Sequence, residues 1–115
     1  EAKLKGLDAY IRGLGASPVY LYLPTSTDFN VERLLKQMGE NPDRYDVLLY
    51  CRLLEKHCQA QQNPLINLWP ALKAAYDRGE LLNFVQDPHY NAAANRIILD
   101  EIVRAMTEWG GFHAP

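Results

Sequence analysis

The sequence has no long apolar run and no excess of charge of either sign. No apolar stretch approaches the about 20 residues that a membrane-spanning helix needs, so we expect no membrane segment. Lysine and arginine together number 12 and aspartate and glutamate 14, which gives a net charge of −2. Because nucleic-acid binding draws much of its affinity from neutralised phosphates, this balance argues against a nucleic-acid partner.

Cysteine is scarce, and the two that occur, Cys51 and Cys58, are badly placed for a disulfide. On one helix they would lie seven positions apart, about 10 Å along the axis, whereas a disulfide needs Cα atoms closer than about 7 Å. We therefore expect free, buried thiols and a reducing, cytoplasmic location. Neither C-x-x-C nor H-x-x-x-H spacing occurs, so the sequence predicts no metal site and no cofactor.

The length and composition are those of one globular domain. The chain has 115 residues, of which 48% are hydrophobic and 23% charged, values that suit a packed core. We expect residues 1–115 to form a single helical domain. The chain begins at Glu1 instead of methionine, and we interpret it as a fragment of a longer protein or a trimmed chain, with a mature chain after signal cleavage as the alternative.

Helical periodicity recurs along the sequence, and capping residues mark its boundaries. The segment Asn41-Pro42-Asp43 is a start signal for a long central helix, and Asp87-Pro88 is a start signal for the last one. Trp69-Pro70 breaks the pattern between them, and residues 63–67 read as a short turn or helix. The pattern predicts about five helices, at roughly 2–14, 29–38, 42–61, 70–79 and 88–109.

One segment differs from the rest. In "SPVYLYLPTS", residues 17–26, apolar and aromatic residues alternate between Pro18 and Pro24, a pattern typical of a short edge strand. We therefore predict a mainly α fold with one minor β element near residues 18–23. Residues 46–51 and 80–86 are its candidate strand partners. The first would make the chain a small α/β protein, but its Asn-Pro-Asp cap favours a helix.

Catalytic signatures are weak. The three histidines are His57, His89 and His113, and no nucleophile stands beside one of them in a known pattern. Asp87 and His89 flank Pro88 and would suit an acid–base pair, but we favour the interpretation of Asp87 as a helix cap and His89 as a first-turn residue. We expect no catalysis from this domain in isolation.

Two functional hypotheses remain. In the first, the chain is a protein-interaction or adaptor domain that binds another protein, or a second copy of itself, through Tyr20 and Tyr22 on the edge strand. In the second, it binds a small ligand where the strand ends, at the loop formed by Thr25, Ser26, Thr27 and Asp28. The partner, pathway and oligomeric state are not encoded in any motif that we recognise.

Overall fold

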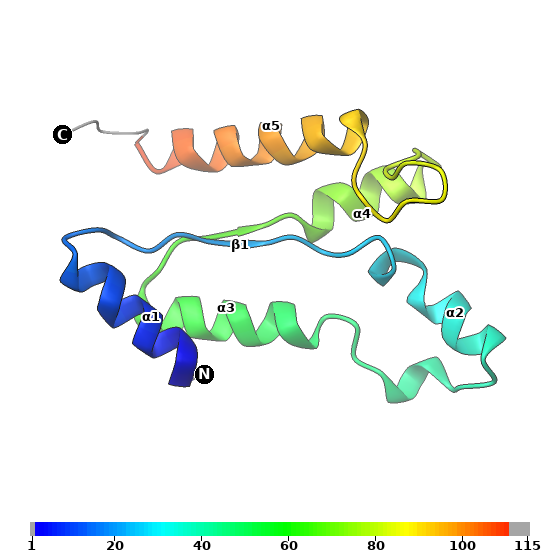
Figure 1. Cartoon of the computed structure of the whole chain (residues 1–115), viewed down its shortest axis with the longest axis horizontal. Helices are drawn as coiled ribbons and strands as arrows, with labels where there is room; N and C mark the ends of the chain where they lie inside the picture. Colours follow the sequence, from blue (N-terminus) through cyan, green and yellow to red (C-terminus); the bar gives the residue numbers. More distant parts are fainter. Residues whose placement is uncertain (1, 111–115) are drawn as a thin grey trace. The chain divides into compact units, whose positions relative to one another are not determined.

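The computed structural model describes residues 2–110 and confirms a mainly helical chain with a minor β element (Figure 1). The described residues form five α-helices, two short strands and two single 3-10 turns. In chain order these are α1 (Ala2–Gly13), β1 (Tyr20–Tyr22), η1 (Asp28–Asn30), α2 (Val31–Gln37), η2 (Pro42–Arg44), α3 (Leu49–Gln61), β2 (Leu65–Asn67), α4 (Trp69–Asp77) and α5 (Ala92–Glu108). No described helix combines the length and the apolar character needed to cross a membrane.

Contacts divide the chain into two compact units, and each unit is drawn from two separate stretches of sequence. Unit 1 combines the described residues up to Tyr22 with Leu48–Asn67, and unit 2 combines Leu23–Val47 with the described residues from Leu68 onward. The sheet, α1 and α3 therefore belong to unit 1, whereas α2, α4 and α5 belong to unit 2. The expectation of a single domain stays a prediction.

The strand partner of β1 is neither of the two segments that we predicted. β1 pairs in parallel with β2, with Leu21 opposite Ile66, and the two strands form the sheet of unit 1. Residues 63–67, which read as a turn or helix, thus provide the partner. Three residues are too few for a periodic signal, so the pairing is set by tertiary contacts with α3, which packs against both strands (Figure 1).

The predicted central helix at 42–61 is two elements in the structure. The Asn41 side chain accepts a hydrogen bond from the Asp43 backbone, as expected of a cap, but the turn that it starts ends at Tyr45, whose backbone is extended. α3 begins only at Leu49. The alternative of a strand at 46–51 is wrong, because residues 46–48 lie outside any strand and 49–51 are helical.

The last helix begins later than Asp87 indicated. Asn91 is its cap, since its side chain accepts hydrogen bonds from the backbones of Ala93 and Ala94. Asp87 instead closes a local turn by accepting from the His89 backbone at 2.7 Å. Residues 80–86, the second candidate partner, form no regular strand: the segment is a loop that contributes one isolated antiparallel bridge, Asn83 with Tyr90.

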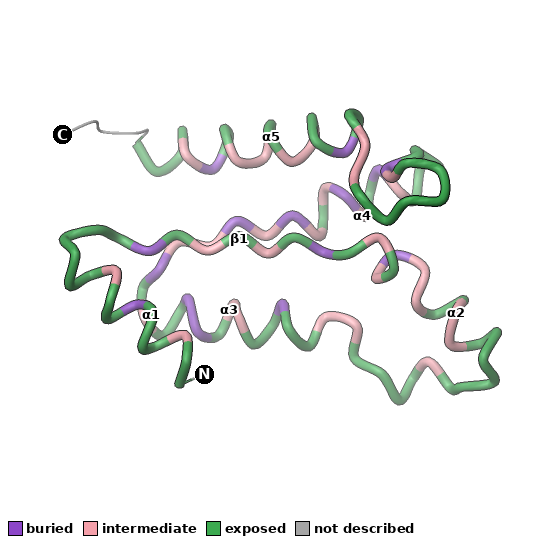
Figure 2. Tube along the Cα trace, in the orientation of Figure 1, coloured by how far each residue is buried: buried purple, intermediate pink, exposed green. Residues whose placement is uncertain are grey.

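Both units have buried residues along the chain (Figure 2), but the kinds of residue that they bury differ. The interior of unit 2 is apolar, with Leu68, Leu72 and Ala75 fully buried. In unit 1 the buried residue of α1 is Asp8, while Leu7 and Leu14 are 46% and 68% exposed. The interior of unit 1 therefore combines apolar residues with three buried polar side chains, those of Asp8, His57 and Asn63. A buried carboxylate needs partners to compensate for its lost hydration.

Candidate functional site

Tyr20 is one of the two predicted partner contacts, and its hydroxyl is used inside unit 1. The hydroxyl donates to Asp8 at 2.5 Å, and the ring lies edge-to-face against His57, with centroids 5.6 Å apart. Tyr22 is partly buried and also has an interaction of its own. A partner would therefore meet only part of each ring, and their role as partner contacts stays a prediction.

Asp8 is the centre of a buried hydrogen-bond network. Its carboxylate accepts from Tyr20, from His57 Nε2 at 2.8 Å and from Asn63 Nδ2 at 2.9 Å. The Asn63 side-chain oxygen in turn accepts from Arg12 at 2.5 Å. Residues from α1, β1, α3 and the loop before β2 thus converge on one carboxylate, so the network ties together all parts of unit 1.

The charges in this network follow from the hydrogen bonds. The bond from Tyr20 is the largest influence that lowers the pKa of Asp8 below 3.8, and bonds from Asn63 and His57 add to it against the opposing effect of burial. Burial, followed by the bond to the Asp8 carboxylate, raises the pKa of Tyr20 to about 12. Asp8 is therefore ionised and Tyr20 protonated at neutral pH.

Among the described residues, no activated thiol accompanies this network. An ionised Asp8 can only accept, so His57 donates to it from Nε2. Its other nitrogen, Nδ1, is buried and has no hydrogen-bond partner among the described residues. Burial also raises the pKa of the neighbouring Cys58 thiol, which disfavours a thiolate nucleophile. We interpret the network as a structural element of unit 1.

Sequence reasoning missed Asp8 and Asn63. One signal was available, because Leu4, Asp8 and Ile11 share a helical face, and a carboxylate on an otherwise apolar face is unusual. The thiols were predicted correctly: Cys51 and Cys58 are free and buried on the unbroken helix α3. His113 lies outside the described residues.

The loop that we predicted as a ligand site lines a groove in unit 2. The groove has a volume of about 500 Å³, and Thr25, Ser26 and Thr27 face Pro88, His89 and Tyr90 across it, with Leu23 and Pro24 completing the wall. The Tyr90 hydroxyl donates to the Pro24 carbonyl at 2.6 Å and joins the two sides. The Asp28 carboxylate forms a hydrogen bond within the loop, because it accepts from the Thr25 backbone N–H at 2.7 Å.

Asp87 orients the histidine of this groove. Its carboxylate oxygen lies 2.5 Å from His89 Nδ1, and hydrogen bonds from the His89 backbone and side chain lower the pKa of Asp87. The ring therefore carries a proton on Nδ1 and directs Nε2 away from Asp87. The side chain of His89 is 82% exposed, so this pair offers a polar contact in water and not a desolvated acid–base site.

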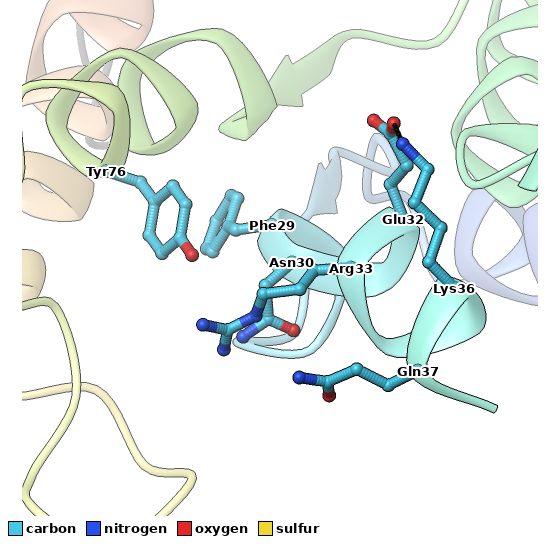
Figure 3. Close-up of a pocket in the computed structure, with 7 residues that line it drawn as sticks. All are labelled: Phe29, Asn30, Glu32, Arg33, Lys36, Gln37 and Tyr76. Atoms are coloured by element: carbon cyan, nitrogen blue, oxygen red, sulfur yellow. Dashed lines mark hydrogen bonds and ion pairs between the residues drawn. The ribbon is translucent and has the colours of Figure 1, made fainter.

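A second cavity in unit 2, of about 590 Å³, lies beside α2 (Figure 3). Phe29 and Tyr76 form an aromatic wall with ring centroids 5.4 Å apart. The other lining residues come from η1 and α2: Asn30, Glu32, Arg33, Lys36 and Gln37. Sequence reasoning missed this cavity, because the polar face of α2 is indistinguishable in a sequence from an ordinary solvated face.

Other evidence on function is sparse. Within residues 2–110, no group of three or more histidine, cysteine, aspartate or glutamate side chains is arranged to hold a metal ion. Comparison with protein-family models finds no match for this chain, and comparisons with curated proteins and with solved structures find none either. A functional assignment therefore depends on the geometry of the chain itself.

Proposed function

We propose that the chain is a non-catalytic interaction domain that extends its sheet by adding a strand from a second copy of itself. The observation that carries the proposal is the one-sided pairing of β1. The Tyr20 backbone donates to the Pro64 carbonyl at 3.0 Å, so the backbone groups of Tyr20 face β2. Since these groups alternate along a strand, those of Leu21 face the opposite edge, where no described strand pairs with them.

The side chains at this edge support the same proposal. Val19, Leu21 and Leu23 are 49%, 40% and 44% exposed, which is unusual for three apolar residues in a row on one strand face. An unpaired edge with apolar side chains is a template for strand addition. The prolines at 18 and 24 have the same parity as Tyr20, so their missing N–H groups lie toward β2 and leave the outer edge intact.

The sequence of β1 explains why the second strand would come from an identical chain. Around Leu21 the pattern is nearly palindromic, with tyrosine at each neighbouring position and an aliphatic residue two positions away on each side. An antiparallel pair centred on Leu21 places Tyr20 opposite the partner's Tyr22 and Val19 opposite the partner's Leu23. A two-fold interface of this kind is self-complementary, and aromatic cross-strand pairs stabilise it.

Sedimentation equilibrium with an edge-blocking variant tests this proposal. Leu21→Pro removes the outward N–H group and leaves the Tyr20–Pro64 bond in place, so we expect a monomer, whereas Leu21→Ala retains the N–H group and should still dimerise. Val19→Pro repeats the test outside the regular strand in case Leu21→Pro disturbs the fold, which circular dichroism would reveal. A wild-type chain that stays monomeric at the highest soluble concentration would refute the proposal.

A second candidate function is supported by the groove at Thr25–Thr27. None of the three side-chain hydroxyls has a hydrogen-bond partner among the described residues, and no lysine or arginine lines the groove. We propose that it binds a small, uncharged, polyhydroxylated ligand, with His89 Nε2 and the hydroxyls as hydrogen-bond partners and the Tyr90 ring beneath.

Titration of the chain with a panel of monosaccharides, followed by the amide NMR signals of residues 25–27 and 88–90, tests this second function. We expect shifts that Ser26→Ala weakens and that Thr107→Ala, a hydroxyl deletion on α5, leaves unchanged. If no monosaccharide moves these signals, the groove does not have this function.

A further inference from the structure

We propose that the cavity beside α2 binds the phosphoryl group of a small phosphorylated ligand. The cavity shares no lining residue with β1 or with the groove at Thr25–Thr27. The inference therefore does not depend on either proposed function. It rests on three features of the cavity: an uncompensated positive charge, a set of unused hydrogen-bond donors, and a fixed aromatic wall.

The positive charge belongs to Arg33. Two cations and one anion line the cavity, but Lys36 donates to Glu32 at 2.6 Å, so those two charges compensate each other. No acidic side chain of the described residues forms an ion pair with Arg33. The lining therefore has one unpaired positive charge on a guanidinium, whose planar donors fit phosphate oxygens in pairs.

Further donors converge on the same space. In Figure 3 the side chains of Arg33, Asn30 and Gln37 end on one side of α2, below the hydroxyl of Tyr76, whereas the Glu32–Lys36 pair lies on the other side. The Gln37 amide and the Tyr76 hydroxyl have no hydrogen-bond partner among the described residues. The Asn30 oxygen is also buried and unpartnered, but it is an acceptor and adds no donor for an anion.

The wall of the cavity is held in place by stacking. Phe29 lies between two aromatic rings, with centroids 5.3 Å from Trp69 and 5.4 Å from Tyr76 and interplanar angles of 26° and 24°. Phe29 is itself only 7% exposed. Because η1 leads directly into α2, this stack helps to fix the start of the helix from which Asn30 and Arg33 project.

The number of donors distinguishes a phosphoryl group from a carboxylate. The guanidinium fork alone can satisfy two carboxylate oxygens. The Gln37 amide and the Tyr76 hydroxyl then remain available, and the three terminal oxygens of a phosphoryl group can accept from them as well. The chemistry of the lining therefore favours the phosphoryl group, and the Tyr76 ring offers a contact for an adjoining planar group.

Phenyl phosphate is a suitable probe, with benzoate as the carboxylate comparison and inorganic phosphate as the comparison without a ring. In an NMR titration of the full chain, we expect phenyl phosphate to shift the amide signals of residues 29–37 and to bind more tightly than either comparison. Arg33→Gln should raise the dissociation constant about tenfold or more, the usual effect of losing charged hydrogen bonds. Arg33→Lys keeps the positive charge but loses the paired donors of the guanidinium. We expect its dissociation constant for phenyl phosphate to lie between those of the wild-type chain and Arg33→Gln.

Arg96→Gln is the matched control, because it removes the same charge from α5 and does not line this cavity. We expect it to bind phenyl phosphate like the wild-type chain. Three results would overturn the inference: no shift at residues 29–37, unchanged affinity in Arg33→Gln, or an equal loss in Arg96→Gln, which would indicate general attraction of anions. Tighter binding of benzoate would overturn the assignment to a phosphoryl group.

Discussion

Asp8 is the residue on which unit 1 depends most. It is 3% exposed and accepts three side-chain hydrogen bonds from three different elements. Removing the charge would leave donors around it without a full acceptor, which is costly in a buried site. The buried residue of α1 is thus a carboxylate, whereas Leu7 of the same helix is 46% exposed.

The lowered pKa of Asp8 predicts a specific acid sensitivity. A carboxyl whose pKa is lower in the folded than in the unfolded state stabilises the fold above the unfolded value, here 3.8, and this contribution is lost as the pH falls through the lower, folded value. Urea denaturation of wild type and Asp8→Asn should therefore show a large difference in unfolding free energy at pH 7 that shrinks below pH 3.8. A difference that stays constant with pH would contradict this role.

Tyr20→Phe tests the same network from the donor side. Loss of the hydroxyl that donates to Asp8 should lower the free energy of unfolding by about 1 to 3 kcal/mol, as for other bonds to a charged acceptor. Because the pKa of Tyr20 is raised from 10.0 to about 12, the difference from wild type should persist below pH 10.0 and shrink as the pH approaches the folded value. Tyr10→Phe, on the exposed side of α1, is the matched control and should cost little.

The N-terminal cap of α5 is not determined by residue type alone, because neighbouring hydrogen bonds select one of two suitable residues. Asp87 and Asn91 both suit a cap in the sequence. The structure uses Asn91, which also donates to the Leu81 carbonyl at 2.5 Å and so fixes the loop before the helix. Asp87 is occupied by its hydrogen bonds with His89.

This difference predicts an unequal effect of two alanine substitutions. Asn91→Ala removes the cap of α5 and the bond to Leu81, so it should lower the free energy of unfolding by about 1 to 2 kcal/mol. Asp87→Ala removes only hydrogen bonds in an exposed turn, so it should lower the free energy of unfolding by less than Asn91→Ala does. Thermal unfolding followed by circular dichroism measures both, and a larger loss for Asp87→Ala would contradict the assignment of the cap.

For the chain as a whole, the main feature is that segments of the two units alternate along the sequence. Unit 1 needs Leu48–Asn67 as well as the residues up to Tyr22. A fragment of residues 1–47 would lack β2, the described strand partner of β1, and α3, which supplies His57 to Asp8.

We therefore expect residues 1–47 to show no cooperative unfolding transition, because α1 alone is too short to be stable in water. Circular dichroism and urea denaturation of the fragment are the measurement. The fragment of residues 1–67, which restores both missing elements, is the comparison and should regain a transition. Cooperative folding of residues 1–47 would show that the Asp8 network is dispensable.

The sequence by itself determined the local structure of this protein. Helical spacing and the proline-bounded stretch before residue 24 each act over a few neighbouring residues, so the presence of the helices and of β1 was predictable, although the starts of α3 and α5 were not. The thiols of Cys51 and Cys58 were predictable for the same reason, since one helix fixes their separation.

Tertiary structure alone decided the partner of β1, the burial of Asp8 and the cavity between Arg33 and Tyr76. Each depends on residues far apart in the chain: Leu21 and Ile66, Asp8 and His57, Phe29 and Tyr76. The three residues of β2 follow Asn63-Pro64, a pair that also opens turns and helices, so their local pattern does not identify a strand. A carboxylate on a helix is polar whether it faces water or a histidine. Only the long-range contacts distinguish these cases, because the free energy that decides them comes from groups that the local sequence does not contain.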